Sequence, residues 1–284
     1  MTGLPVHLSQ RGLDPDLAGD HLLHLVREAI TNHPRSQQVR IGPSEIGHPC
    51  ARRIGYKMLG HPEREGEPNW KATVGTALHS WLEGVLDQAN IAYEQRTKSG
   101  QERYYTEQRV TVGQILGTDI DGSCDVYDRV TATVVDWKSV GPTQLTKYKR
   151  FGPGDQYRSQ AHLYGRGWQT QGEPVDNVMV VFLPRNGELA ETHIWHEPYS
   201  EQVALDALQR ANGIALTTQA LGPAALTQLP TADEYCHMCS YFLAGSTDLA
   251  KGCPGDPGST ASKPINNSGP AFGAVTNTQG VLIS

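Results

Sequence analysis

Two short segments in the middle of the sequence carry carboxylates and a lysine at a spacing that suits hydrolytic chemistry. The first, GSCD, ends at Asp125, and the second, DWK, begins eleven positions later at Asp136 and ends at Lys138. Both lie in runs rich in β-branched residues, which predict neighbouring strands. Asp125 and Asp136 can therefore converge at one end of a hairpin. Lys138 shares a strand face with Asp136 because side chains alternate with a period of two.

These groups are the ones that metal-assisted hydrolysis of a phosphodiester requires. Carboxylate oxygens bind Mg²⁺ or Mn²⁺ beside the scissile phosphate, and a lysine orients the attacking water or neutralises developing charge. The alternative is a solvated sheet edge, since Asp-X-Lys is a common pattern. The apolar run Thr-Val-Val before Asp136 favours the metal site, because a charge that closes a buried strand is often paired or functional.

The five cysteines indicate a second metal site. Cys236 and Cys239 form a CxxC hook that can bind one metal centre across a tight turn, Cys253 supplies a third thiolate and Cys50 a fourth. Four thiolates suit Zn²⁺ or a 4Fe-4S cluster, and the spacing does not choose between them. Unrelated buried thiols are the other interpretation. Cys124 points away from Asp125 along its strand, and we expect it to be packed in the core.

Length and composition narrow the class of protein. The chain has 284 residues, a net charge of −6, 38% hydrophobic and 19% charged residues. This length supports a core without disulfides, and no apolar run approaches the roughly 18 residues of a membrane helix. The N-terminus resembles no signal peptide, so we expect a soluble cytoplasmic protein with no membrane partner. Mild acidity argues against a purely electrostatic nucleic-acid binder, but not against an enzyme that reaches nucleic acid through metal ions.

The elements that position these residues follow from hydrophobic periodicity. Helical patterns cover 14–33, a short stretch after Ser44 that ends at Gly60, and 71–90, 155–171 and 199–220. TEQRVTV, QILGTDI, GSCDVYD and TATVVDWKSV predict an antiparallel meander, and VDNVMVVFLP and LAETHIW predict two further strands. The order predicts an α/β fold with a central mixed sheet flanked by helices. His79 and Glu83 share one face of the 71–90 helix.

The order of these motifs resembles the RecB-type branch of the PD-(D/E)XK nucleases. GTALH with His79, GSCD, DWK and the helix segment QAHLY match that series over about residues 42–255. The resemblance implies a restriction-endonuclease-like core. It also implies roles for individual residues: metal ligation by His79, Asp125, Asp136 and the Trp137 carbonyl, and catalytic or positioning roles for Lys138, Gln160 and Tyr164.

Two of these roles have ordinary alternatives. Gln160 and Tyr164 lie one helical turn apart and can face the site together. Tyr164 could equally pack with its hydroxyl at the surface. Glu83 could contact His79 or pair with a surface cation.

The cysteines resemble a feature of particular RecB-type nucleases. AddB-type helicase-nuclease subunits and CRISPR-associated nucleases of the Cas-four type carry one cysteine before the core and three after it, and these bind a 4Fe-4S cluster. CARRIGY, from Cys50, is similar to their first-cysteine segment. The resemblance implies an iron–sulfur-stapled helical portion with Cys50, Cys236, Cys239 and Cys253 as ligands. Thirteen residues separate Cys239 from Cys253, more than is usual in these nucleases. His237 is therefore a second, weaker candidate for the ligand position of Cys253.

Two small basic groups suit contact with nucleic acid, although a solvated face is the alternative for both. The second group is interleaved with aromatic residues, a combination that suits single strands. The first comprises Arg52, Arg53 and Lys57, and the second comprises Lys147, Lys149 and Arg150, with Tyr148 and Phe151 among them.

We expect four segments: an N-terminal helical part (1–70), a nuclease core (71–220), a cluster-binding part (221–255) and a flexible tail (256–284) rich in Gly, Pro, Ser and Asn. Together these features indicate a Mg²⁺- or Mn²⁺-dependent DNA exonuclease with a 4Fe-4S cluster. It would act on single-stranded or fraying ends in recombination, replication or repair, alone or with a recombination partner, and in the host cytoplasm if phage-encoded. The alternatives are a structure-selective or CRISPR-adaptation endonuclease, and an inactive DNA-binding protein stabilised by zinc or a cluster.

Overall fold

The computed structural model of the chain describes residues 15–33, 40–64, 68–233 and 235–258. Nearly all of the predicted flexible tail lies outside these ranges. Four helices precede the sheet: α1 (Pro15–Thr31), α2 (Pro43–Ile46), α3 (Ala51–Met58) and α4 (Trp70–Thr97). The remaining elements are β1 (Tyr104–Ile115), β2 (Thr118–Asp128), β3 (Thr133–Val140), α5 (Pro142–Phe151), α6 (Gly154–Thr170), β4 (Asn177–Pro184), β5 (His193–Pro198), α7 (Glu201–Leu221) and α8 (Ala225–Gln228).

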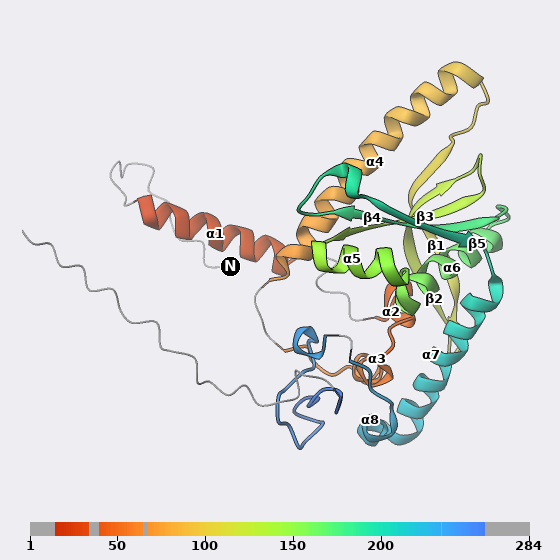
Figure 1. Cartoon of the computed structure of the whole chain (residues 1–284). Coiled ribbons are helices and arrows are strands. Elements are labelled where there is room, and N and C mark those ends of the chain that lie inside the picture. Colours follow the sequence, from red (N-terminus) through yellow and green to blue (C-terminus); the bar gives the residue numbers. More distant parts are fainter. Residues whose placement is uncertain (1–14, 34–39, 65–67, 234, 259–284) are drawn as a thin grey trace, which may run out of the picture.

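One mixed sheet organises the described residues, and its order is β1-β2-β3-β4-β5. β1, β2 and β3 form an antiparallel meander, β4 pairs parallel to β3, and β5 is antiparallel to β4. A parallel neighbour needs a crossover connection, and α5 and α6 supply it between β3 and β4 (Figure 1). The predicted α/β fold with a central sheet flanked by helices is confirmed.

Helices cover both faces of the sheet unequally. On one face, α6 and α7 pack against β1, β2 and β4 around the large core that contains Leu163, Trp168 and Leu208. On the other face, α4 crosses β1 and β3, and its Leu86 packs on a small core that includes Val126 and Val135 (Figure 1). The large core stabilises the fold, and α4 on the opposite face presents His79 to β2 and β3.

A buried amide joins α4 to the sheet. Asn90 donates from Nδ2 to the Tyr104 carbonyl, and its Oδ1 accepts from the amides of Arg103 and Tyr104. Asn90 is 7% exposed, so these three bonds form away from most of the solvent. They fix the position of α4 along β1 and with it the place of His79.

Two helical predictions need correction. Ser44 does not cap a helix, because α2 begins at Pro43 after Gly42, and Pro is favoured at the first helical position. α2 also ends before Pro49, so the predicted stretch consists of two separate helices. α5 was not predicted, although Pro142 opens it in the same way.

The described segment 50–64 and the segment 236–256 pack together below the sheet, and we call this pair of segments the clasp (Figure 1). The Tyr56 ring stacks on Tyr241 with centroids 4.9 Å apart, and its hydroxyl donates to the Leu249 carbonyl at 2.7 Å. Phe242 and Cys253 form a β-bridge within the second segment. The clasp thus brings Cys50 to the three C-terminal cysteines.

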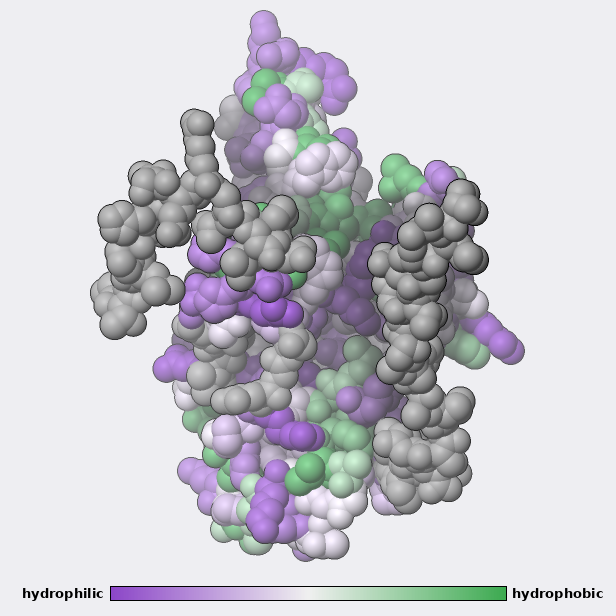
Figure 2. All heavy atoms as spheres, turned by 90° about the vertical axis from the view of Figure 1, so that its left-hand side faces the viewer, coloured by the Kyte–Doolittle hydropathy of each residue, from purple (hydrophilic) through white to green (hydrophobic). Residues whose placement is uncertain are grey.

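No helix among the described residues is both long enough and apolar enough to span a bilayer. On the face shown in Figure 2, outside the grey atoms, hydrophilic and hydrophobic residues lie side by side without one continuous apolar patch.

Candidate active site

His79 enters the site from α4 with a defined ring orientation. Its Nε2 lies 3.1 Å from the Trp137 carbonyl of β3, and a carbonyl can only accept a hydrogen bond. Nε2 therefore carries the proton. Nδ1 is left facing the carboxylates of the sheet.

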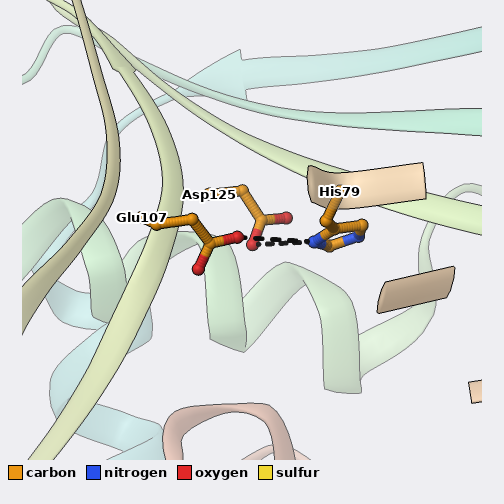
Figure 3. Close-up of side chains that lie close together, drawn as sticks. All are labelled: His79, Glu107 and Asp125. Atoms are coloured by element: carbon orange, nitrogen blue, oxygen red, sulfur yellow. Dashed lines mark ion pairs between the residues drawn. The ribbon is translucent and has the colours of Figure 1, made fainter. Parts of the chain in front are cut away.

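The carboxylates that face His79 come from two strands. Asp125 Oδ1, from β2, lies 3.5 Å from Nδ1, and Glu107 Oε1, from β1, lies 3.8 Å from it (Figure 3). One ligand atom from each of the three residues lies within 4.8 Å of the others, a closeness that no other trio of His, Cys, Asp or Glu among the described residues has. Nδ1 is buried and has no hydrogen-bond partner. An imidazole nitrogen between two carboxylates fits a divalent cation.

The charges of these three groups are strongly linked. Burial lowers the pKa of His79, but Asp125 and Glu107 outweigh this effect and raise it to about 10. Burial raises the pKa of Asp125, but His79, Lys138 and the Trp137 amide together hold it below its usual value. The carboxylates thus require a positive charge between them, which a proton on Nδ1 or a bound cation can supply.

Asp136 and Lys138 form a second group beside the first. Asp136 is 1% exposed, its Oδ2 lies 2.5 Å from Lys138 Nζ, and its Oδ1 accepts from Gln160 Nε2 at 2.9 Å. Burial and the neighbouring carboxylate of Asp125 raise the pKa of Asp136 to about 6, against the opposing effect of Lys138. The predicted shared face of Asp136 and Lys138 is present. The structure places Glu107, and not Asp136, in the trio with His79 and Asp125, and ligation by Asp136 stays a prediction.

Asp125 and Asp136 meet where two strands separate. β2 and β3 pair through Asp128, Tyr127 and Val126, and the ladder ends there. Just beyond it, the Trp137 amide donates to Asp125 Oδ2 at 2.8 Å. The Asp125 side chain thus replaces the backbone acceptor that a continued ladder would supply to Trp137. It thereby holds Asp125 at the point where β2 and β3 separate.

Gln160 and Tyr164 both face the site from α6. They are 4% and 5% exposed, so both side chains are buried, and the roles of both stay predictions. Burial and the carboxylates of Asp136 and Asp125 raise the pKa of the Tyr164 hydroxyl. Gly122 permits this approach, because a Cβ there would lie 2.7 Å from Pro43 and 3.1 Å from the Tyr164 ring.

Sequence reasoning missed Glu107. The residue lies in the run TEQRVTV, where a charge inside a strand is ordinarily expected to face solvent. Its φ is 49°, a left-handed conformation that non-glycine residues rarely adopt and that is often found at functional sites. No signal in the sequence reveals that backbone conformation.

The four predicted cluster cysteines line one pocket in the clasp, together with His48 and Arg53. The pocket has about 390 Å³ of empty space, part of it open to solvent. His237 does not line it, whereas Cys253 does, which favours Cys253 as the fourth ligand. Cys124 is fully buried in the main core, as expected.

Four thiolates around one pocket suit either tetrahedral Zn²⁺, which binds all four sulfurs itself, or a 4Fe-4S cubane, in which each thiolate binds a different iron. Both stay predictions for this pocket.

Backbone and side-chain donors point at two of the sulfurs. The Asp256 amide donates to Cys236 Sγ at 3.3 Å, and Arg52 Nη1 donates to Cys253 Sγ at 3.9 Å. Burial raises the pKa of Cys236 and of Cys239, so metal binding would have to displace their protons.

The first basic group is largely engaged in contacts within the clasp and α2. Lys57 Nζ lies 2.8 Å from the Glu45 carboxylate, Arg53 contacts His48 Nε2 at 3.2 Å, and Arg52 contacts Cys253. In the second group, on α5, Lys149 and Arg150 are exposed. Nucleic-acid binding by either group stays a prediction.

No family model matches the chain, and no curated protein does. Several solved structures show a distant likeness. One is an alkaline exonuclease from Laribacter hongkongensis, 10% identical, with 66% of this chain and 91% of that one covered and a TM-score of 0.37. Another is a phage-related exonuclease from Haemophilus somnus 129PT, 12% identical, with 67% and 83% covered and a TM-score of 0.35. A protein from Eubacterium rectale is 18% identical, with 73% and 89% covered and a TM-score of 0.39. Likenesses at this level are too distant to carry an inference of activity.

Proposed function

We propose that the chain is a metal-dependent deoxyribonuclease of RecB type that acts as an exonuclease on single-stranded or fraying DNA ends. One observation carries the proposal. His79, Glu107 and Asp125 converge from a helix and two strands, next to the buried pair of Asp136 and Lys138. An imidazole, carboxylates and a lysine at the fork between two strands suit phosphodiester hydrolysis better than any other common reaction.

His79 Nδ1, Glu107 and Asp125 would hold Mg²⁺ or Mn²⁺. A bound divalent cation lowers the pKa of a water ligand and offsets the charge on the phosphate. The Trp137 carbonyl fixes the His79 ring, so that Nδ1 points inward without rearrangement. Asp136 holds Lys138 in place, and Gln160 holds Asp136 from the other side. The ammonium of Lys138 would then orient the attacking water or stabilise the developing charge.

Cleavage of end-labelled DNA tests this function directly. We expect the wild-type chain to release nucleotides in Mg²⁺ or Mn²⁺ and to lose this activity in EDTA. Lys138→Ala should reduce the rate by at least about 100-fold, the usual contribution of a positioned proton or charge donor. Lys251→Ala, which removes an exposed lysine in the clasp, should cleave as wild type does.

The same assay separates the main proposal from its alternatives. Circular single-stranded DNA has no ends, so an exonuclease leaves it intact. Its cleavage would favour the endonuclease alternative. Cleavage by Lys138→Ala at the wild-type rate would contradict the catalytic role proposed for Lys138.

We further propose that Cys50, Cys236, Cys239 and Cys253 bind a 4Fe-4S cluster that stabilises the clasp. Support comes from the pocket that the four cysteines share, because four thiolates are the ligand set that such a cluster requires. Protein purified anaerobically should be brown, absorb near about 400 nm and contain iron and sulfide. Stoichiometric zinc without iron would contradict the cluster and support the zinc alternative.

A further inference from the structure

A strip of cations and aromatic rings extends along α5 to the residue that precedes the clasp. It consists of Lys147, Arg150 and Phe151 on α5, and of Tyr235, directly before Cys236; we call it the α5 strip. We propose that the α5 strip binds single-stranded DNA and holds it at the active site. This inference rests on the proposed nuclease function and deepens it by naming where the strand lies.

The packing of α5 determines which side chains form the strip. Leu145 is buried, and the Tyr148 ring stacks on Phe182 of β4 with centroids 4.3 Å apart, so this side of α5 faces the core. At 3.6 residues per turn, Lys147, Arg150 and Phe151 share the side that faces away. Lys149 projects from a separate flank of the helix.

Each ring of the strip is paired with a cation. Lys147 Nζ lies 5.6 Å from the centre of the Tyr235 ring, and the Arg150 guanidinium lies 4.9 Å from the centre of the Phe151 ring. Phe151 is 69% exposed and Tyr235 is 41% exposed. Exposed rings beside cations offer stacking to bases and neutralisation to phosphates, the two interactions that hold single strands.

The helix that carries the strip packs close to the catalytic lysine. Lys138 Nζ lies 4.9 Å from the Tyr157 ring, and the Tyr157 and Tyr148 rings have centroids 5.7 Å apart. Tyr148 lies on the buried side of α5, opposite the strip, and it stacks on Phe182. The two rings therefore place the helix that carries the strip beside the ring that Lys138 contacts.

The chemistry of the strip favours a single strand over a duplex. In a duplex the bases are stacked on one another and do not offer their faces to protein rings. A single strand can place a base on Phe151 or Tyr235 while its phosphates approach Lys147 and Arg150. The net charge of −6 makes a general electrostatic attraction to duplex DNA a weak competitor.

Fluorescence with the full chain tests the proposal. We would use Lys138→Ala as the background, with Mg²⁺ present, so that DNA binds without being cut. Adding Phe151→Ala should weaken binding of a short single strand roughly fivefold or more, and should reduce the quenching of a 2-aminopurine base in that strand. Phe151→Trp should restore both. Lys147→Ala and Arg150→Ala should each lower the slope of log affinity against log salt by about 0.7.

Lys149→Ala is the matched control, because it removes the same charge from the other flank of α5. It should change affinity less than Lys147→Ala does. The proposal would be overturned if all of these variants bound single-stranded DNA with equal affinity. Tighter binding of a duplex than of a single strand would also overturn it. That result would leave the nuclease proposal standing, because wild-type cleavage tests it separately. Circular dichroism melting curves identify any variant that fails to fold.

Discussion

The carboxylate of Asp125 accepts a hydrogen bond from the backbone amide of Trp137 just past the last paired residues of β2 and β3. One oxygen thus closes the fork between the strands while the other faces His79. A single side chain therefore has both a structural and a chemical task.

Substitution of Asp125 should separate these tasks. Asp125→Asn keeps an acceptor for the Trp137 amide but lacks the charge that a cation needs, so we expect cleavage to fall by at least about 100-fold. Asp125→Ala should lose the same activity and, relative to Asn, about 1–3 kcal/mol of unfolding free energy, because the amide loses its acceptor. Urea denaturation measures the difference. Equal stability of the two variants would contradict the structural task.

Glu107→Gln should weaken metal binding. Glu107 lies with His79 and Asp125, so removing its charge should raise the Kd for Mn²⁺ roughly 10- to 100-fold, as loss of an interaction at a metal site commonly does. Isothermal titration calorimetry gives this value directly. The control is Glu83→Gln, which alters a carboxylate one turn from His79 on α4 that is not part of the trio. An identical Kd for both variants would exclude Glu107 as a ligand.

Arg52 should tune the redox potential of the proposed cluster. Its guanidinium donates to Cys253 Sγ, and its Nε is buried without a hydrogen-bond partner. A positive charge and an N–H at a ligand sulfur favour the reduced cluster, so Arg52→Gln should lower the midpoint potential by tens of millivolts. A potentiometric titration followed by absorbance checks this. Lys251→Gln, which removes an exposed charge two residues before Cys253, should leave the midpoint potential unchanged. An equal shift in the two variants would attribute the effect to net charge and would contradict a specific role for Arg52.

His162 should make the fold sensitive to acid. It is fully buried on α6, its Nδ1 accepts from the Ser200 amide, and its Nε2 lies 2.6 Å from Glu197, which also pairs with Arg158. Burial lowers the pKa of His162 more than Glu197 raises it.

Because that pKa lies below the unfolded value of about 6.5, the unfolded chain binds more protons as the pH falls through this range. Stability contributed by neutral His162 is thus present above about pH 6.5 and is lost below it. The loss of stability can be measured as the decrease in melting temperature between pH 7.5 and pH 5, in the wild type and in His162→Gln. We expect a smaller pH-dependent decrease in the variant, and an equal decrease would exclude His162 as its source.

Local patterns predicted the parts of the site that lie within one strand or one helix turn. Asp136 and Lys138 meet because strand side chains alternate, and Gln160 and Tyr164 face the same way because helix turns repeat. Glu107 could not be found in this way, since its position depends on a left-handed backbone at one residue and on the course of α4 over β1. Both are consequences of packing between distant segments.

The cysteine set shows the same division. Residue type and the CxxC spacing indicated a metal site, but the distance between Cys239 and Cys253 along the chain made Cys253 doubtful. The fold returns Cys253 to the pocket through the bridge to Phe242, whereas His237 does not line that pocket. The number of residues between Cys239 and Cys253 does not predict that the chain folds back to bring Cys253 into the pocket.

The clasp also constrains the order in which the chain can fold. Tyr56 and Leu249, which it joins, are 193 positions apart. Contacts of such long range are slow to form, because closing a long loop costs chain entropy before the contact stabilises it. On the ribosome, segment 50–64 emerges long before its partner and must wait for it with Tyr56 uncovered. We therefore expect the clasp to close late in folding, after segment 236–256 has been synthesised.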